Sequence, residues 1–189
     1  MSGAKRPKNA KKCLEKAFFK EYKKHQLSEI NVSKLCKEAG VKRSAFYYHF
    51  GNVRDLLNSI EDDFIEAYKE SALKAWLAYK KGDDDYHKAA ELSLKYLYKN
   101  QDLLVTILYK KSDWRFVDEW RKNIIKQLSR LFVGSDEASV YIAASAVIAY
   151  YRFAIMKDVK IEEVNPESLL SLITSILKSE PKMIDKAAE

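Results

Sequence analysis

Glycine and proline are scarce in this chain, which limits the number of tight turns it can form. The chain of 189 residues holds 5 Gly and 3 Pro. Eight such residues are about 4% of the chain, whereas average usage gives roughly 12%. Sheet proteins place Gly and Pro at their many tight turns, so the composition argues against a β-sandwich or β-barrel. An aromatic share of 12% also argues against a disordered chain.

The internal Gly and Pro residues separate stretches with helical apolar spacing, and no stretch has the pattern of a strand. Leu14, Phe18 and Tyr22 repeat every four residues and define one apolar face. Asn31 and Asn52 stand where helix N-caps are expected. The sequence therefore predicts an all-α chain of about nine helices, over residues 8–24, 31–39, 41–50, 53–81, 86–99, 102–109, 113–132, 136–156 and 166–179.

Positive charge is concentrated in the first quarter of the chain. Residues 1–54 carry 14 Lys and Arg against 4 Asp and Glu, whereas residues 55–189 carry 20 against 23. An excess of this kind indicates a polyanionic partner for the first segment. On charge alone, a solvated basic face without a partner is equally consistent. We divide the chain into a small basic domain, 1–54, and a larger helical domain, 55–189.

The two short predicted helices 31–39 and 41–50 have the spacing of a helix-turn-helix motif, with Gly40 in the turn. Phe46 and Phe50 lie four residues apart on the second helix and are its expected buried anchors. A recognition helix presents its N-terminal residues to base edges, where Arg and Lys donate to guanine. Tyr and His side chains farther along such a helix can donate to phosphates.

The segment AGVKRSAFYYHF, with the residues from Ile30 that precede it, resembles the DNA-binding signature of TetR-family transcriptional regulators. The resemblance covers about residues 8–60. It implies an N-terminal three-helix helix-turn-helix domain and a C-terminal helical domain for ligand binding and dimerisation. It further implies a homodimer that binds a palindromic operator as a repressor and is released by a small-molecule effector. The positions that match the family's DNA contacts are Ser33, Lys42, Arg43, Ser44, Ala45, Tyr47, Tyr48, His49, Asn52 and Arg54.

Some of these residues have alternative interpretations. Lys42 stands where the family usually has a capping Ser, Thr or Asn, and since Lys cannot cap, we expect it to face DNA. Val53 replaces a frequent Lys, and Arg54 is a substitute for that phosphate contact. Tyr47 could serve packing alone, and His49 could stabilise the C-terminal helix dipole. The basic residues near the N-terminus, Lys5, Arg6 and Lys8, form either a disordered tail or an arm on DNA.

The second domain is rich in aromatic residues and contains a helix, 136–156, that is apolar nearly all round. Tyr and Trp can line a ligand cavity, although a single such residue is more often part of the core. A helix that is apolar on every side must be covered on several sides, by a partner subunit or by the chain itself. The candidate ligand-binding residues are Tyr96, Tyr109, Trp114, Trp120 and Tyr150. The candidate dimer residues are Ala143, Ala146, Val147, Tyr150, Leu170, Ile173 and Leu177.

Enzyme motifs are missing from the sequence, so we expect no catalytic residue, no metal site and no cofactor. Cys13 and Cys36 have neither disulfide nor zinc spacing.

The polar N-terminus does not resemble a signal peptide, and the longest uncharged stretch, 138–151, is shorter than a bilayer span. We therefore expect a cytoplasmic protein that binds double-stranded DNA. The alternative within the same family is a regulator controlled by a protein partner, or an activator, without a small-molecule ligand.

Overall fold

The computed structural model describes residues 9–80, 86–111, 113–157 and 166–177. Across these residues the chain forms nine α-helices and no strand, which confirms the predicted all-α class. The chain folds into two compact units, one ending at Phe64 and the other beginning at Ile65. The division falls inside a long helix rather than at its start. The basic N-terminal residues expected to be a tail or a DNA arm lie outside the described residues.

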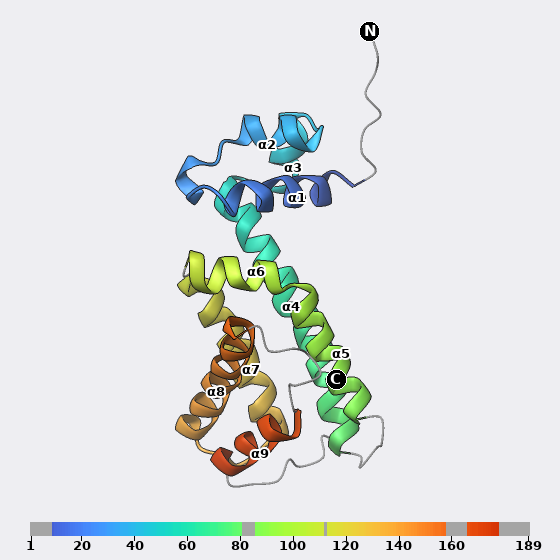
Figure 1. The fold of residues 1–189 in the computed structure, drawn as a ribbon, viewed down its shortest axis with the longest axis vertical. Coiled ribbons are helices and arrows are strands. Elements are labelled where there is room, and N and C mark those ends of the chain that lie inside the picture. Colours follow the sequence, from blue (N-terminus) through green and yellow to red (C-terminus); the bar gives the residue numbers. More distant parts are fainter. Residues whose placement is uncertain (1–8, 81–85, 112, 158–165, 178–189) are drawn as a thin grey trace. The chain divides into compact units, whose positions relative to one another are not determined.

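The first unit is a small bundle built from short helices around one apolar core (Figure 1). Helix α1 packs against α2 and α3, which also pack against each other. Its core includes Leu14, Phe18, Leu35 and Phe46, none of which has solvent-exposed surface. The elements are α1 (Ala10–Tyr22), the 3₁₀ turn η1 (Leu27–Glu29), α2 (Val32–Ala39), α3 (Arg43–His49) and the first turns of α4 (Val53–Lys80).

Local signals set the ends of the short helices in this unit. The Asn31 side chain accepts hydrogen bonds from the backbone N–H groups of Ser33 and Lys34, which confirms it as the N-cap of α2. Gly40 ends α2 with φ of +66°, a left-handed conformation that favours glycine. At the start of α4, Asn52 accepts from the backbone N–H of Asp55. These caps fix both ends of α2 and the start of α4. Helix α3 lies between them, directly after the tight turn at Gly40.

The second unit contains the rest of α4 and the helices that follow it (Figure 1). Helix α8 packs against α7 and α9, and smaller contacts join α5 to α6 and α9. The sequence predicts one helix over residues 102–109, but the structure has a short α-helix, α6, that continues into a π-helical turn, η2. The elements are α5 (Tyr86–Lys99), α6 (Gln101–Val105), η2 (Thr106–Lys110), α7 (Trp114–Leu131), α8 (Glu137–Met156) and α9 (Pro166–Leu177).

Helix α8 is the most apolar long helix of the described chain. Among the described residues it alone is long and apolar enough to cross a membrane by length and composition. However, eight of its residues are buried within the chain, and α7 and α9 cover two of its sides. These contacts are typical of the central helix of a folded domain.

Candidate nucleic-acid interface

Helix α3 presents aromatic and basic side chains to solvent while two phenylalanines anchor it. Phe46 is fully buried and Phe50 retains 5% exposure, which confirms both predicted anchors. On the other face, Tyr48 is 84% exposed and Tyr47 is 51% exposed. A large aromatic side chain with this much exposure in a small domain indicates a binding surface.

Every residue that the sequence assigned to DNA contact lies at least partly on the surface of the first unit. Ala45 is half-buried, and the other nine are exposed. They come from three places: one from α2, most from α3 and its N-cap, and two from the start of α4. The nine exposed residues are Ser33, Lys42, Arg43, Ser44, Tyr47, Tyr48, His49, Asn52 and Arg54.

Lys42 occupies the N-cap position of α3 without a capping side-chain hydrogen bond. Its carbonyl oxygen accepts the backbone N–H of Ala45, which begins the helix. The Lys42 side chain is exposed at the start of α3 and does not cap the helix, as its chemistry predicts. Next to it, the Arg43 guanidinium lies over the Tyr47 ring, 5.9 Å from the ring centroid.

Two ion pairs join α1 to α2 across the surface of this unit. The Lys20 ammonium lies 2.5 Å from a Glu38 carboxylate oxygen, and the Lys34 ammonium lies 2.5 Å from a Glu21 oxygen. The hydrogen bond from Lys34 holds the pKa of Glu21 below its ordinary value. These four charges pair with one another and tie α1 to α2.

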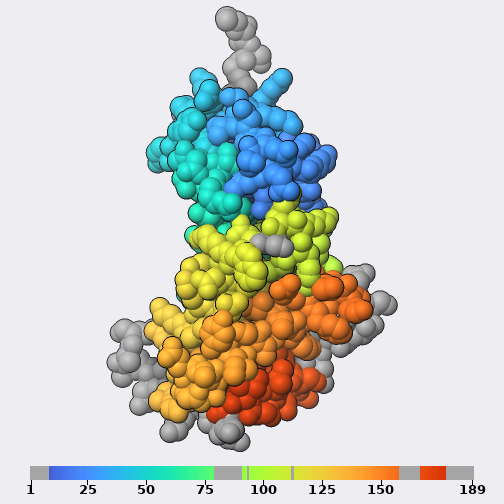
Figure 2. Space-filling model, turned by 90° about the vertical axis from the view of Figure 1, so that its left-hand side faces the viewer, coloured from blue at the N-terminus to red at the C-terminus, as the bar shows by residue number. Residues whose placement is uncertain are grey.

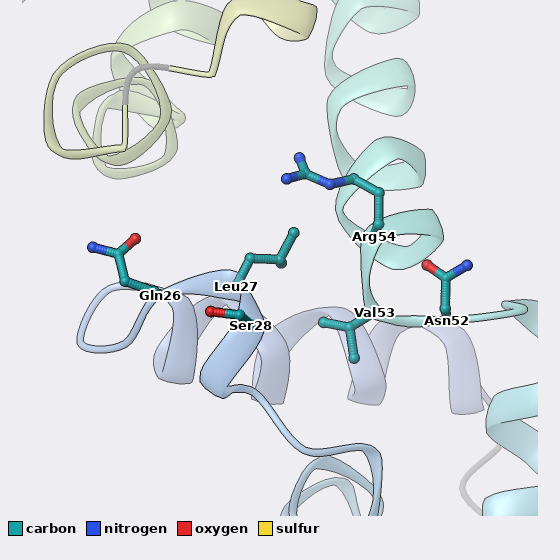
Figure 3. Close-up of a pocket in the computed structure, with 6 residues that line it drawn as sticks. All are labelled: Gln26, Leu27, Ser28, Asn52, Val53 and Arg54. Carbon is teal, nitrogen blue, oxygen red and sulfur yellow. The ribbon is translucent and has the colours of Figure 1, made fainter.

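An open concavity lies beside this surface, between the α1–α2 connection and the start of α4. Figure 3 shows Gln26, Leu27 and Ser28 on one side of it and the residues at the start of α4 on the other. No local sequence signal predicts this feature, because it arises where two segments far apart in sequence meet. The lining on the α4 side is Asn52, Val53 and Arg54.

The five aromatic residues expected to bind a ligand do not share one environment. Trp120 is fully buried, whereas Trp114 is 77% exposed. Tyr96, Tyr109 and Tyr150 are intermediate. The Tyr109 hydroxyl donates to the carbonyl oxygen of Arg152, 2.6 Å away, and so joins η2 to α8. Because most of its side chain is exposed, Trp114 is a surface residue of the described chain.

Trp120 belongs to a compact aromatic cluster in the second unit. Its ring lies parallel to that of Tyr151 at 6.4 Å, and Tyr68 packs edge-on against both rings at 5.4 and 6.0 Å. Burial raises the pKa of Tyr68 well above its ordinary value, so its hydroxyl stays protonated. Helical spacing predicts Tyr68 on the inner face of its helix, but spacing alone cannot show that these three rings meet.

Most residues expected at a dimer interface are buried within this chain. Five of them have at most 8% exposure, namely Ala143, Val147, Leu170, Ile173 and Leu177. Their side chains fill the core of the second unit, where α8 and α9 pack together. Only Ala146 and Tyr150 keep partial exposure. The five buried residues therefore have little surface left for a partner subunit in this structure.

A different set of apolar residues is exposed along α8 and α9. Ile142, Phe153 and Met156 are 56%, 59% and 64% exposed and follow helical spacing on α8. Leu172 of α9 is 44% exposed. Figure 2 shows the surfaces of α8 and α9, orange and red, adjoining on one side of the molecule. We call these four residues the α8–α9 stripe.

The described ranges contain no group of three His, Cys, Asp or Glu side chains that could hold a metal ion. Cys36 is buried in α2, and burial raises the pKa of its thiol. Neither of these observations supplies a reactive centre near α3.

Known proteins share the sequence pattern of the helix-turn-helix and the fold of the chain. Residues 20–60 match the sequence model of a family described as "Bacterial regulatory proteins, tetR family". No curated protein sequence matches the chain. The fold resembles that of the dihydroxyacetone kinase operon activator DhaS, with a TM-score of 0.59 and 20% identity over 92% of this chain and 98% of that one.

Two further solved structures share the fold. The TetR transcriptional regulator from Streptococcus agalactiae 2603V has a TM-score of 0.57 and 21% identity, over 89% of this chain and 93% of that one. A SmeT–triclosan complex has a TM-score of 0.59 and 13% identity, over 96% of this chain and 100% of that one. At these identities the likeness concerns the fold, while the family match covers the segment that contains α2, α3 and the start of α4.

Proposed function

Because the chain belongs to the TetR family of transcriptional regulators, we propose that it binds a specific double-stranded DNA sequence through α3. The observation that carries this proposal is the exposed surface of α3, where Arg43, Tyr47 and Tyr48 are open to solvent while Phe46 is buried. A helix anchored in this way on one face can enter the major groove with the other.

The proposed roles follow the chemistry of each side chain. Lys42 and Arg43, at the helix start, donate to base edges, where Arg recognises guanine through two hydrogen bonds. Ser44 and the small Ala45 approach the bases closely. Tyr48 and His49 donate to phosphates and fix the docking of the helix. Ser33, Asn52 and Arg54 contact the DNA backbone on either side of α3.

We propose that the protein acts as a homodimer paired through the α8–α9 stripe. Apolar side chains of this size are normally covered in a folded protein or at an interface. Two copies related by a two-fold axis would bury the stripe in a four-helix arrangement. The same symmetry would present two copies of α3 to two half-sites, so the operator is palindromic.

We propose further that a small-molecule effector binds in the second unit and releases the DNA, so that the protein acts as a repressor in the bacterial cytoplasm. The support for this proposal comes from a solved structure with the same fold. A fold relative is known as a complex with triclosan. The alternative, an activator, has support from another relative named as an operon activator.

Affinity for a duplex as a function of salt tests the DNA-binding proposal. Fluorescence anisotropy with a mixed-sequence duplex should give a Kd that rises steeply between about 50 and 200 mM salt, since bound cations are released from phosphates. A Kd that stays constant over this range would refute DNA binding. Native mass spectrometry of the purified protein tests the effector. A co-purified small molecule that lowers duplex affinity supports release, whereas one that raises it supports the activator.

A further inference from the structure

Arg43 and Tyr47 of α3 form a contact with each other before any DNA is present. Arg43 is the first residue of the helix, and Tyr47 lies one turn later. Side chains on a helix lean toward its N-terminus, so Tyr47 reaches back to Arg43. The guanidinium lies 5.9 Å from the ring centroid, and an Arg43 Nη2 donates to the Tyr47 hydroxyl at 3.5 Å.

The Tyr47 ring is itself held by the core of the unit. It meets the Phe46 ring edge-on, with the centroids 5.3 Å apart and the planes at 83°. Phe46 is fully buried, whereas Tyr47 is 51% exposed. The Tyr47 ring therefore packs against a buried core residue, Phe46, and also contacts the Arg43 guanidinium. This arrangement connects the core to Arg43 through Tyr47.

We propose that Tyr47 is a positioning residue, which sets the direction of the Arg43 guanidinium so that it reads one base pair. The proposal rests on the DNA-binding function proposed above and assigns Tyr47 a different role from the phosphate donor expected from sequence. Arg has a long and flexible side chain, and two hydrogen bonds to guanine require a defined plane for its guanidinium. A ring that restricts Arg43 beforehand reduces the conformational freedom lost on binding.

Two parts of Tyr47 contact Arg43, and each contact is at the outer limit of its range. The Arg43 Nη2 is 3.5 Å from the Tyr47 hydroxyl, the long limit for a hydrogen bond. The guanidinium is 5.9 Å from the ring centroid, the outer limit for a cation–π contact. Tyr47→Phe keeps the ring and removes the hydroxyl, whereas Tyr47→Leu removes the aromatic face. The two variants therefore separate the contribution of the ring from that of the hydroxyl.

A double-mutant cycle on a selected operator tests the proposal. The operator is first obtained by selecting bound duplexes from a random pool. Affinities for it, and for operators with single base-pair changes, are then measured for Tyr47→Leu, Arg43→Ala and the double variant. Low salt keeps the weak complexes measurable, because phosphate contacts then persist. Tyr48→Leu is the matched control, since Tyr48 is on the same helix and packs against His49 rather than Arg43.

The expected result is a coupled effect on one base pair. Tyr47→Leu should weaken operator binding about tenfold and relax the preference at the same base pair as Arg43→Ala. In the Arg43→Ala protein, Tyr47→Leu should have no further effect. Any effect of Tyr47→Phe should likewise disappear in the Arg43→Ala protein. Tyr48→Leu should weaken all duplexes alike and add fully to Arg43→Ala.

Three outcomes would overturn the proposal. If Tyr47→Phe weakens binding as much as Tyr47→Leu, and the loss persists without Arg43, then Tyr47 contacts phosphate directly. If Tyr47→Leu lowers the thermal midpoint together with affinity for every duplex, its role is packing. If the Arg43 and Tyr47 variants relax different base pairs, the two side chains act independently. A failure of the unchanged protein to prefer any selected sequence would instead refute the proposed function.

Discussion

Replacing Phe153 with alanine tests the proposed pairing surface of α8 and α9. Burial of a phenylalanine side chain stabilises by about 1.5–3 kcal/mol, and Phe153 is 59% exposed in the single chain. A partner can therefore recover about 1–2 kcal/mol at this position. A two-fold interface contains the residue twice, so Phe153→Ala should cost about 2–4 kcal/mol per dimer, which raises the dimer Kd about 30- to 1000-fold.

Sedimentation equilibrium over a range of protein concentrations measures this Kd. Val147→Ala is the matched control, since Val147 is on the same helix but only 5% exposed. It should lower the thermal midpoint through a lost core contact and leave the dimer Kd nearly unchanged. A Phe153→Ala protein with an unaltered Kd would refute the stripe as the interface. A large rise in Kd for Val147→Ala, with the thermal midpoint preserved, would restore the interface chosen from sequence.

Three further predictions concern the first unit. Asn31→Ala removes the N-cap of α2 and should cost about 1 kcal/mol, seen as a thermal midpoint about 2–4 °C lower; an unchanged midpoint would contradict the capping role. Tyr48→Ala should weaken operator binding by about 1–3 kcal/mol while the midpoint stays constant, because the side chain is 84% exposed. A joint loss of midpoint and affinity would mean that Tyr48 packs in the core. The Glu21 carboxylate, whose pKa is lowered by Lys34, stabilises the folded state above its ordinary pKa and loses this effect as pH falls through the lowered value. The midpoint difference between the unchanged protein and Glu21→Gln should therefore shrink below about pH 4, and a constant difference down to pH 2 would contradict the pairing.

The helix-turn-helix is predictable in detail because its signals are local. Asn31 caps a helix through neighbouring backbone groups, and Gly40 allows the left-handed turn that follows. The spacing of Phe46 and Phe50 defines the buried face of α3 without information from elsewhere in the chain. The side-chain chemistry of Lys42 is enough to predict that it does not cap the helix.

The second unit is harder to predict because its determinants are not local. Helix α8 is apolar on nearly every side, so periodicity does not distinguish Val147, which is buried, from Phe153, which is exposed. That choice depends on where α7 and α9 pack. The pairing of Arg43 with Tyr47 has a local signal in their spacing of four residues, but the family resemblance assigns both side chains to DNA and not to each other. The π-helical turn at Thr106–Lys110 has no signal in the sequence that we recognise.

Selection of bound duplexes from a random pool tests the central claim most directly, which is that α3 reads a specific DNA sequence. Parallel selections with the unchanged protein and with Arg43→Ala isolate the contribution of the recognition helix. The account predicts that the unchanged protein enriches a two-fold-symmetric sequence with a guanine at one position of each half-site, and that Arg43→Ala loses the preference at that position. Recovery of a pool with no enriched sequence, or of the same sequence with both proteins, would contradict it.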